Sequence, residues 1–276
     1  MSPGRLVVVG TPIGNLGDLS PRATEALAAA SVVASEDTRR TGRLLAHAGV
    51  RVDLLRFDAT VERDRTPELV DRIRNGEVVA LVTDAGMPAL SDPGAHLVRS
   101  VREAGLAVEV VPGPFAGVVA LVASGLCPDS GRFTFEGFLP RRGAERVERL
   151  AGIAGSPCPS VVYESPRRVV PTLGDLLEVC GPERRVALCR ELTKLHEEVW
   201  VGSLVGAVDH LASNPPRGEY VLVVDPAPES TPVDDDTIRT AVEEELAAGA
   251  TRRDATRVVA RRLGVPPNRV KRLAGP

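Results

Sequence analysis

The sequence predicts two α/β domains followed by a helical extension, and three observations support this. Up to residue 123, short valine-rich runs alternate with segments of helical pattern, as expected of a parallel sheet covered by helices. Near Cys127-Pro128-Asp129 the expected strands become shorter and more aromatic. After residue 224, a proline-rich acidic stretch precedes a strongly basic end. The expected parts are two α/β domains at 1–125 and 126–226, and an acidic linker with a basic helical extension at 227–276.

The chain opens with a strand, a glycine-rich loop and a helix. Residues 6–9 form a continuous β-branched run, typical of a strand buried on both faces. Gly10, Gly14 and Gly17 then leave main-chain N–H groups able to face a ligand. Ser20 is expected to cap the helix, with Pro21 at its first position. A second short strand, VVAS, carries residues 36–39 to its C-terminal end.

The spacing of these glycines, G-x3-G-x2-G, separates the loop from better-known motifs. A dinucleotide loop requires G-x-G-x-x-G, and a phosphate loop ends in Gly-Lys-Ser/Thr. Glu36 and Asp37 nevertheless lie about 20 residues past the glycines, where a dinucleotide fold places its ribose-binding acid. A dinucleotide site therefore remains an alternative, as does a tight turn that binds nothing.

Two further turn-rich loops follow predicted strands of the first domain. They are TDAGMPALSDPG, residues 83–94, and PGPFAG, residues 112–117. Open α/β sheets bind ligands at the carboxyl ends of their strands, so all three loops are expected at one binding edge. Around these loops, strands are expected at 52–56, 78–82 and 107–111. One helix is expected at 41–48, ended by Gly49, and another up to residue 74, with Thr66 as its N-cap and Pro67 at its first position. A third helix, with Ser91 as its N-cap, is expected to end at 104, and a fourth at Ala123.

The second half is expected to be a sheet of mixed strand direction. Its predicted strands are 132–137, 160–163, 185–189, 197–201 and 219–224, with helices at 141–150, up to Cys180 and from Ser203. Residues 225–236 are expected to form a linker. Residues 251–276 carry eight basic side chains against Asp254 alone, a net charge of +7, and are expected to form two helices joined by the turn at 263–266, much like a helix-turn-helix. Such an end on a chain of net charge −3 suggests a polyanionic partner, although a solvated amphipathic cap is the plainer alternative.

Composition narrows the class of protein. Apolar residues make up 43% and charged residues 26%, and no apolar run approaches the roughly 18 residues of a membrane span. The first residues lack the pattern of a signal peptide. The four cysteines and four histidines are dispersed, without the spacing of a metal site. The sequence therefore predicts a cytoplasmic protein with no metal and no membrane contact.

Six motifs in order resemble one known family. GTPIGNLGDLS, ASEDTRRT, TDAGMPALSDPG, VPGPFAG, YESPRR and RELTK resemble the tetrapyrrole methylase superfamily of S-adenosylmethionine enzymes. Within it, the chain is similar to the 2′-O-methyltransferases that modify a cytidine in the decoding region of 16S rRNA. The resemblance extends from Arg5 to Lys271. It implies an active site in the cleft between two α/β domains, S-adenosylmethionine as cofactor, a homodimer, and 16S rRNA as substrate, within the small ribosomal subunit.

The resemblance also implies residues that border the methyl donor. They are Pro12, Gly86, Met87, Phe115, Ala116, Ser165, Leu192 and Glu219. Relatives that methylate tetrapyrroles have Gly-Asp-Pro where this chain has Gly86-Met87-Pro88, and RNA-modifying relatives usually have Thr in the middle. Methionine should still accept the cofactor but removes a hydroxyl contact.

Methyl transfer to a ribose hydroxyl needs alignment and gains from a base or a nearby cation. The base candidates are Glu36, Asp37 and Glu191, with Arg39 and Lys194 as electrostatic partners or phosphate contacts. For all five, a salt bridge at a domain or dimer interface is an equal alternative. Two other functions remain open: a methylase of a small tetrapyrrole, and a non-catalytic nucleotide- or RNA-binding module. The segment EDTRR and the basic end favour RNA over a tetrapyrrole.

Overall fold

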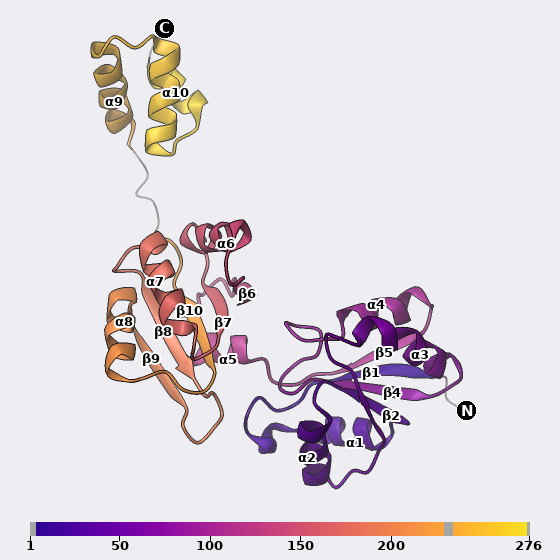
Figure 1. The fold of residues 1–276 in the computed structure, drawn as a ribbon. Coiled ribbons are helices and arrows are strands. Elements are labelled where there is room, and N and C mark those ends of the chain that lie inside the picture. The colour runs from indigo at the N-terminus through magenta and orange to yellow at the C-terminus, as the bar shows by residue number, and fades with distance from the viewer. Residues whose placement is uncertain (1–3, 229–233, 275–276) are drawn as a thin grey trace. The chain divides into compact units, whose positions relative to one another are not determined.

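The computed structural model describes residues 4–228 and 234–274, and the chain divides into two compact units, Met1–Ala227 and Pro228–Pro276 (Figure 1). Residues 229–233 of the predicted linker lie outside the described residues. In the described part of the chain, no helix is long and apolar enough to cross a membrane. The larger unit contains two five-stranded sheets, and the smaller unit is helical.

The first sheet is parallel throughout, with strand order β3-β2-β4-β1-β5. Its strands are β1 (Arg5–Val9), β2 (Val32–Ser35), β3 (Leu54–Arg56), β4 (Val78–Val82) and β5 (Ala107–Val111). The connecting helices are η1 (Leu16–Asp18), α1 (Pro21–Ala28), α2 (Thr38–Ala48), α3 (Glu62–Arg74) and α4 (Ala95–Glu103). Helices α1 and α2 cover one face of the sheet, and α3 and α4 cover the other (Figure 1).

Burial on both faces explains the continuous apolar runs of the central strands. In β1, Leu6 and Val8 pack against α3 and α4, whereas Val7 and Val9 pack against α1 and α2. All four side chains are at most 4% exposed. A strand with one solvated face would need polar residues at alternate positions, so the run itself predicts the two helical layers.

Helix α2 begins at Thr38, three residues before the predicted start. The Asp37 side chain accepts a hydrogen bond from the Arg39 N–H at 2.8 Å and so caps the helix. Arg39 is therefore a first-turn residue, and its side chain is 88% exposed. The predicted end of this helix is confirmed, because Gly49 is its C-cap with φ of 68°.

Two predicted helix caps in this half are wrong. Helix α3 begins at Glu62, so Pro67 lies inside it and the Thr66 hydroxyl donates back to the Glu62 carbonyl at 2.7 Å. Helix α4 is capped by Gly94 and not by Ser91. The Glu62 carboxylate accepts hydrogen bonds from the Gly94 and His96 N–H groups, a cap supplied by a neighbouring helix that local sequence cannot reveal.

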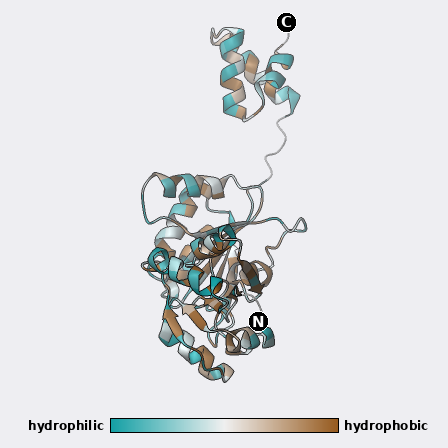
Figure 2. Ribbon diagram, turned by 90° about the vertical axis from the view of Figure 1, so that its right-hand side faces the viewer, coloured by the Kyte–Doolittle hydropathy of each residue, from teal (hydrophilic) through white to brown (hydrophobic). Residues whose placement is uncertain are grey.

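The second sheet is mixed, as predicted, with order β6-β7-β10-β8-β9. Its strands are β6 (Thr134–Phe138), β7 (Ser160–Glu164), β8 (Arg185–Arg190), β9 (Glu198–Ser203) and β10 (Tyr220–Val224). Helix α5 (Ala116–Ala123) packs on one face, and α6 (Ala144–Ala154), α7 (Val169–Cys180) and α8 (Leu204–Ser213) pack on the other. Helices of the chain carry hydrophilic residues beside hydrophobic ones (Figure 2), as expected of a covering layer, whereas α5, AGVVALVA, has no charged residue.

A buried arginine joins α6 to α7. The Arg146 guanidinium, 11% exposed, donates to the Asp175 carboxylate at 2.6 and 2.8 Å and to the Pro140 carbonyl at 2.8 Å.

We expect Arg146→Met to lower the free energy of unfolding in urea by about 2–3 kcal/mol, less than for a fully buried pair because Asp175 is partly solvated. Arg185→Met is the control, since Arg185 is 61% exposed and 4.0 Å from Asp225. Equal losses in the two variants would contradict this prediction.

The smaller unit is a bundle of α9 (Asp235–Ala247), α10 (Arg252–Leu263) and α11 (Pro267–Leu273) around Ile238, Val259 and Val270. The predicted helix pair and its turn are present, but α9 was not predicted, and Asp234 to Asp236 are its cap and first turn and not linker. Acidic residues of α9 form ion pairs with basic residues of α10 and α11, as in Arg269–Asp235 and Arg262–Glu244. Residues 234–274 hold nine basic and seven acidic side chains, so the basic end is partly neutralised within its own unit.

Candidate active site

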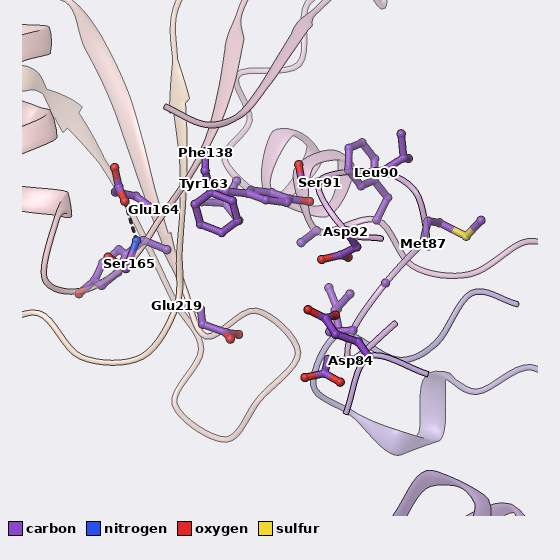
Figure 3. Close-up of a pocket in the computed structure, with 18 of the residues that line it drawn as sticks. Asp84, Met87, Leu90, Ser91, Asp92, Phe138, Tyr163, Glu164, Ser165 and Glu219 are labelled. Atoms are coloured by element: carbon purple, nitrogen blue, oxygen red, sulfur yellow. Dashed lines mark hydrogen bonds between the residues drawn. The ribbon is translucent and has the colours of Figure 1, made fainter. Parts of the chain in front are cut away.

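A pocket of about 490 Å³ lies where loops of the two sheets of the larger unit meet (Figure 3). Figure 3 shows Asp84 and Asp92 on one side of it and Glu164, Ser165 and Glu219 on the other. The volume is in the range of small-molecule and cofactor sites. Its lining comes from the segments around residues 13, 36–40, 84–92, 115–116, 138, 163–166 and 219–221.

The loop after β4 is held in an unusual conformation against the loop after β1. Thr11 and Gly86 exchange both main-chain hydrogen bonds, at 2.9 and 3.1 Å. Gly86 has φ of 85°, and Ala89 and Ser91 also lie in the left-handed region, at 70° and 68°. Such angles are costly for residues with a Cβ and concentrate at functional sites. The loop thus presents main-chain and small side-chain groups to the pocket in a fixed geometry.

The polar lining of the pocket is strongly acidic. Five carboxylates line it and only one guanidinium, that of Arg40; the acids are Glu36, Asp84, Asp92, Glu164 and Glu219. Three of these acids have a cation within 3.3 Å: Asp84 has Arg40, the fully buried Glu164 has Arg168, and Glu219 has Lys194. Glu36 and Asp92 form no ion pair within the described part of the chain, so the unbalanced charge of the lining is negative. A ligand with a positive charge is therefore favoured here, and a polyphosphate is disfavoured.

Aromatic rings form the apolar wall of the pocket. The chain contains only one Trp, two Tyr and five Phe, yet Phe115, Phe135, Phe138 and Tyr163 contact one another here. The Tyr163 hydroxyl accepts a hydrogen bond from the Gly117 N–H at 3.2 Å, which fixes the ring. Phe138 remains 54% exposed at the pocket, and a ring of that exposure can stack on a planar ligand.

Most of the residues predicted to border the donor come together in this pocket. Gly86, Met87, Phe115, Ala116, Ser165 and Glu219 all line it. Pro12 lines an adjoining cavity of about 430 Å³ that shares Ile13, Arg40, Asp84, Ala85 and Glu219 with the pocket. Leu192 is 6% exposed and packs in the core with Ile13 rather than on the pocket lining.

The predicted base candidates are in three different situations. Glu36 lines the pocket and accepts a hydrogen bond from the Thr83 hydroxyl at 2.9 Å. Asp37 points to Arg39 and the start of α2, and the hydrogen bonds from Arg39 lower its pKa to about 2. Glu191 is about 2.8 Å from Lys194, which also contacts Glu219 at 2.8 Å. Burial raises the pKa of Glu191, but hydrogen bonds from Lys194 and the Glu219 N–H outweigh this and lower it overall.

The structure therefore separates the predicted charged residues. Arg39 is solvent-exposed on α2 and does not line the pocket, whereas Lys194 lines the adjoining cavity. Asp84, Asp92, Phe138 and Tyr163 line the pocket but were not predicted as site residues. The two aspartates belong to a loop that the sequence predicts to bind a ligand, so their position after a strand was the available signal. Among the described residues, no group of His, Cys, Asp and Glu could hold a metal ion.

Comparison with known proteins identifies the family. The family model for tetrapyrrole (corrin/porphyrin) methylases matches residues 5–207. The chain belongs to this family. Two similar relatives are the ribosomal RNA small subunit methyltransferases I of a Synechocystis species and of Mycobacterium bovis. The first is 40% identical over 98% of this chain and 97% of its own length, and the second is 44% identical over 94% and 90%.

Solved structures show the same fold in tetrapyrrole methylases. A uroporphyrin-III C-methyltransferase from Thermus thermophilus aligns with a TM-score of 0.57 and 26% identity, covering 80% of this chain and 94% of its own. A structure of uroporphyrin-III C-methyltransferase from the same organism, complexed with S-adenosyl homocysteine, aligns with a TM-score of 0.60 at 21% identity over 80% of this chain and 97% of its own. At that identity the second likeness concerns the fold alone.

Proposed function

We propose that this protein is an S-adenosylmethionine-dependent enzyme that methylates the ribose 2′-oxygen of a cytidine in 16S rRNA. Family membership and the names of relatives 40–45% identical support the reaction class and the rRNA substrate. The observation that carries the choice of cofactor is the acidic pocket lined by both halves of the larger unit.

The pocket fits the methyl donor better than it fits a nicotinamide dinucleotide or a nucleoside triphosphate. S-adenosylmethionine carries a positive sulfur and an α-amino group, and the carboxylates of Glu36 and Asp92, which form no ion pair among the described residues, suit these charges. The phosphates of the alternative ligands would meet the same carboxylates without a free cation in the lining. Gly86 and Ala116 leave main-chain surface open, and Phe115 and Tyr163 offer apolar area for a flat base.

The chain's own contribution to the reaction is mostly alignment. The bound donor supplies a methyl group that is already electrophilic, so the pocket must hold the ribose oxygen in line with the carbon–sulfur bond. Such positioning can supply about 7–11 kcal/mol, more than the roughly 3–5 kcal/mol of one general base. The strained 84–92 loop and the fixed Tyr163 ring are suited to this, because both are tied to neighbouring main chain.

The helical unit favours RNA over a small tetrapyrrole as substrate. The alignment with the Thermus uroporphyrin enzyme covers 80% of this chain, and the family match ends at residue 207. The alignment with the Synechocystis rRNA enzyme covers 98% of this chain, which includes most of the helical unit. Helix α10 places Arg253, Arg257 and Arg261 four residues apart on one face. A row of cations at this spacing suits consecutive phosphates.

The proposed setting is a cytoplasmic homodimer that acts on the small ribosomal subunit. Support for self-association comes from the edge strand β5 and from helix α5, which follows β5 in the chain and packs on the second sheet. Val110 on β5 is 51% exposed and Val122 on α5 is 64% exposed. Exposed apolar side chains on an unpaired sheet edge are a usual feature of a contact between subunits.

Ribose-methylation mapping of rRNA tests the function directly. Cells lacking this protein should lose one 2′-O-methylcytidine from 16S rRNA, and re-expression should restore it. Calorimetry on the purified protein should show binding of S-adenosylmethionine and no micromolar binding of NAD or ATP. An unchanged methylation map, or binding of NAD or ATP without the methyl donor, would refute the proposal.

A further inference from the structure

Three carboxylates of the first half of the larger unit line the pocket, but their partners differ. Glu36 follows β2 and accepts a hydrogen bond from the Thr83 hydroxyl at 2.9 Å. Asp84 follows β4, accepts a hydrogen bond from the Asp37 N–H at 3.1 Å and lies 3.3 Å from Arg40. Asp92 lies in the strained loop between β4 and α4. The charged groups that act on Asp92 are Glu36 and Asp84, and they include no cation.

The Thr83 hydroxyl is engaged by Glu36. It donates to the Glu36 carboxylate at 2.9 Å, and a hydroxyl has a single proton to donate. A hydrogen bond from Thr83 would lower the pKa of Asp92, but burial and the negative charges of Glu36 and Asp84 outweigh it and raise that pKa overall. The surroundings of Asp92 in the pocket therefore favour the binding of a proton.

We propose that the Asp92 carboxylate accepts the proton of the ribose 2′-hydroxyl during methyl transfer. This inference rests on the proposed function. As the bond from the 2′-oxygen to the methyl carbon forms, the carbon–sulfur bond breaks and its electron pair stays on sulfur, which becomes a neutral thioether. The hydroxyl proton passes to Asp92, giving a carboxylic acid that later releases the proton to water.

The acid–base properties of the alternatives support this choice. Burial raises the pKa of Asp92 to about 6, and the negative charges of Glu36 and Asp84 add to the rise. A base of this pKa is deprotonated at neutral pH yet binds a proton far more readily than an ordinary carboxylate. Asp37, with its pKa near 2, and Glu191, held by Lys194, are weaker bases. Burial and the charge of Glu36 also raise the pKa of Asp84, but its carboxylate is paired with Arg40. The remaining titratable groups around the pocket are Arg40, Tyr163, Glu164, Glu219 and Tyr220.

The sign of the pH dependence follows from the raised pKa. Asp92 is the active base only when ionised, so the single-turnover methylation rate should fall tenfold per pH unit below about 6 and level off above it. Glu36→Gln removes one of the neighbouring negative charges. This variant should therefore lower the pKa of Asp92 and move the inflection to lower pH without abolishing it.

The test compares Asp92→Asn with the wild-type protein on small ribosomal subunits that lack the modification. We expect the single-turnover rate to fall roughly 10²–10⁴-fold and the inflection near pH 6 to disappear. Donor affinity by calorimetry should fall far less than the rate does, because the pocket keeps its other carboxylates, and the thermal midpoint should change little, because the amide has nearly the shape of the carboxyl group. Asp84→Asn is the matched control. It should keep an inflection, moved to lower pH as in Glu36→Gln, because it removes a negative charge near Asp92 but leaves the base in place.

Two results would overturn the proposal. One is an Asp92→Asn variant that keeps both the wild-type rate and the inflection. The other is a loss of donor affinity large enough to explain the lower rate, which would make Asp92 a donor-binding residue. Failure of the proposed function gives a different result, because the wild-type protein itself would then transfer no methyl group to the ribose.

Discussion

Gly86→Val should weaken binding of the methyl donor at least hundredfold, the largest binding effect that we expect from a single substitution. Gly86 has φ of 85°, where a β-branched residue is strained, and both of its main-chain hydrogen bonds go to Thr11. An added Cβ would lie 3.5 Å from Ile13 and from the Pro114 carbonyl, so the two methyl groups beyond it must displace one of these or enter the pocket. Titration calorimetry with S-adenosylmethionine measures the effect.

Gly76→Val is the matched control for backbone strain. Gly76 has a similar φ of 94° at the end of α3, with open space around its Cβ position, and it does not line the pocket. The two variants should lose similar stability from strain, but only Gly86→Val should lose donor affinity. If a folded Gly86→Val protein binds the donor as the wild type does, Gly86 is a turn residue and nothing more.

Charge reversal at Arg253 and Arg261 together should reduce affinity for rRNA about 10–100-fold. Both side chains are exposed and line a groove on α10, and neither forms an ion pair within the described part of the chain. For every phosphate that the protein no longer neutralises, the slope of log affinity against log salt should become shallower by roughly 0.7–0.9. Binding assays at several salt concentrations with Arg253→Glu, Arg261→Glu and the double variant measure both quantities.

Arg239→Glu provides the control for this pair of reversals. It makes the same change of charge in the same unit, but Arg239 is on α9 and paired with Asp236. Its RNA affinity and salt slope should stay close to those of the wild type, and donor affinity should be unchanged in every variant. Equal losses of rRNA affinity in Arg239→Glu and Arg253→Glu would show that the net charge of the unit, and not the arginine face of α10, determines RNA binding.

Local sequence determined those features that depend on neighbouring residues alone. The buried run at residues 6–9, the strand at 78–82, the cap at Ser20, the helix end at Gly49 and a helix starting at Ser203 were all predicted and are present. The reason is that side-chain periodicity and capping bonds act within a few residues. The ordered motifs also determined the family, because they span nearly the whole chain.

Tertiary structure decided which charged groups meet. Strand β2 lies next to β4 in the first sheet, and this order brings Glu36 and Asp84, 48 residues apart in the chain, to one pocket with Asp92. From the sequence, Asp84 and Asp92 could be predicted only as turn residues, because strand order and burial create the environment of their carboxylates. The same holds for α9, whose acids balance arginines of α10 and α11. Strand order and helix packing depend on contacts between distant residues, and these exist only once the chain has folded.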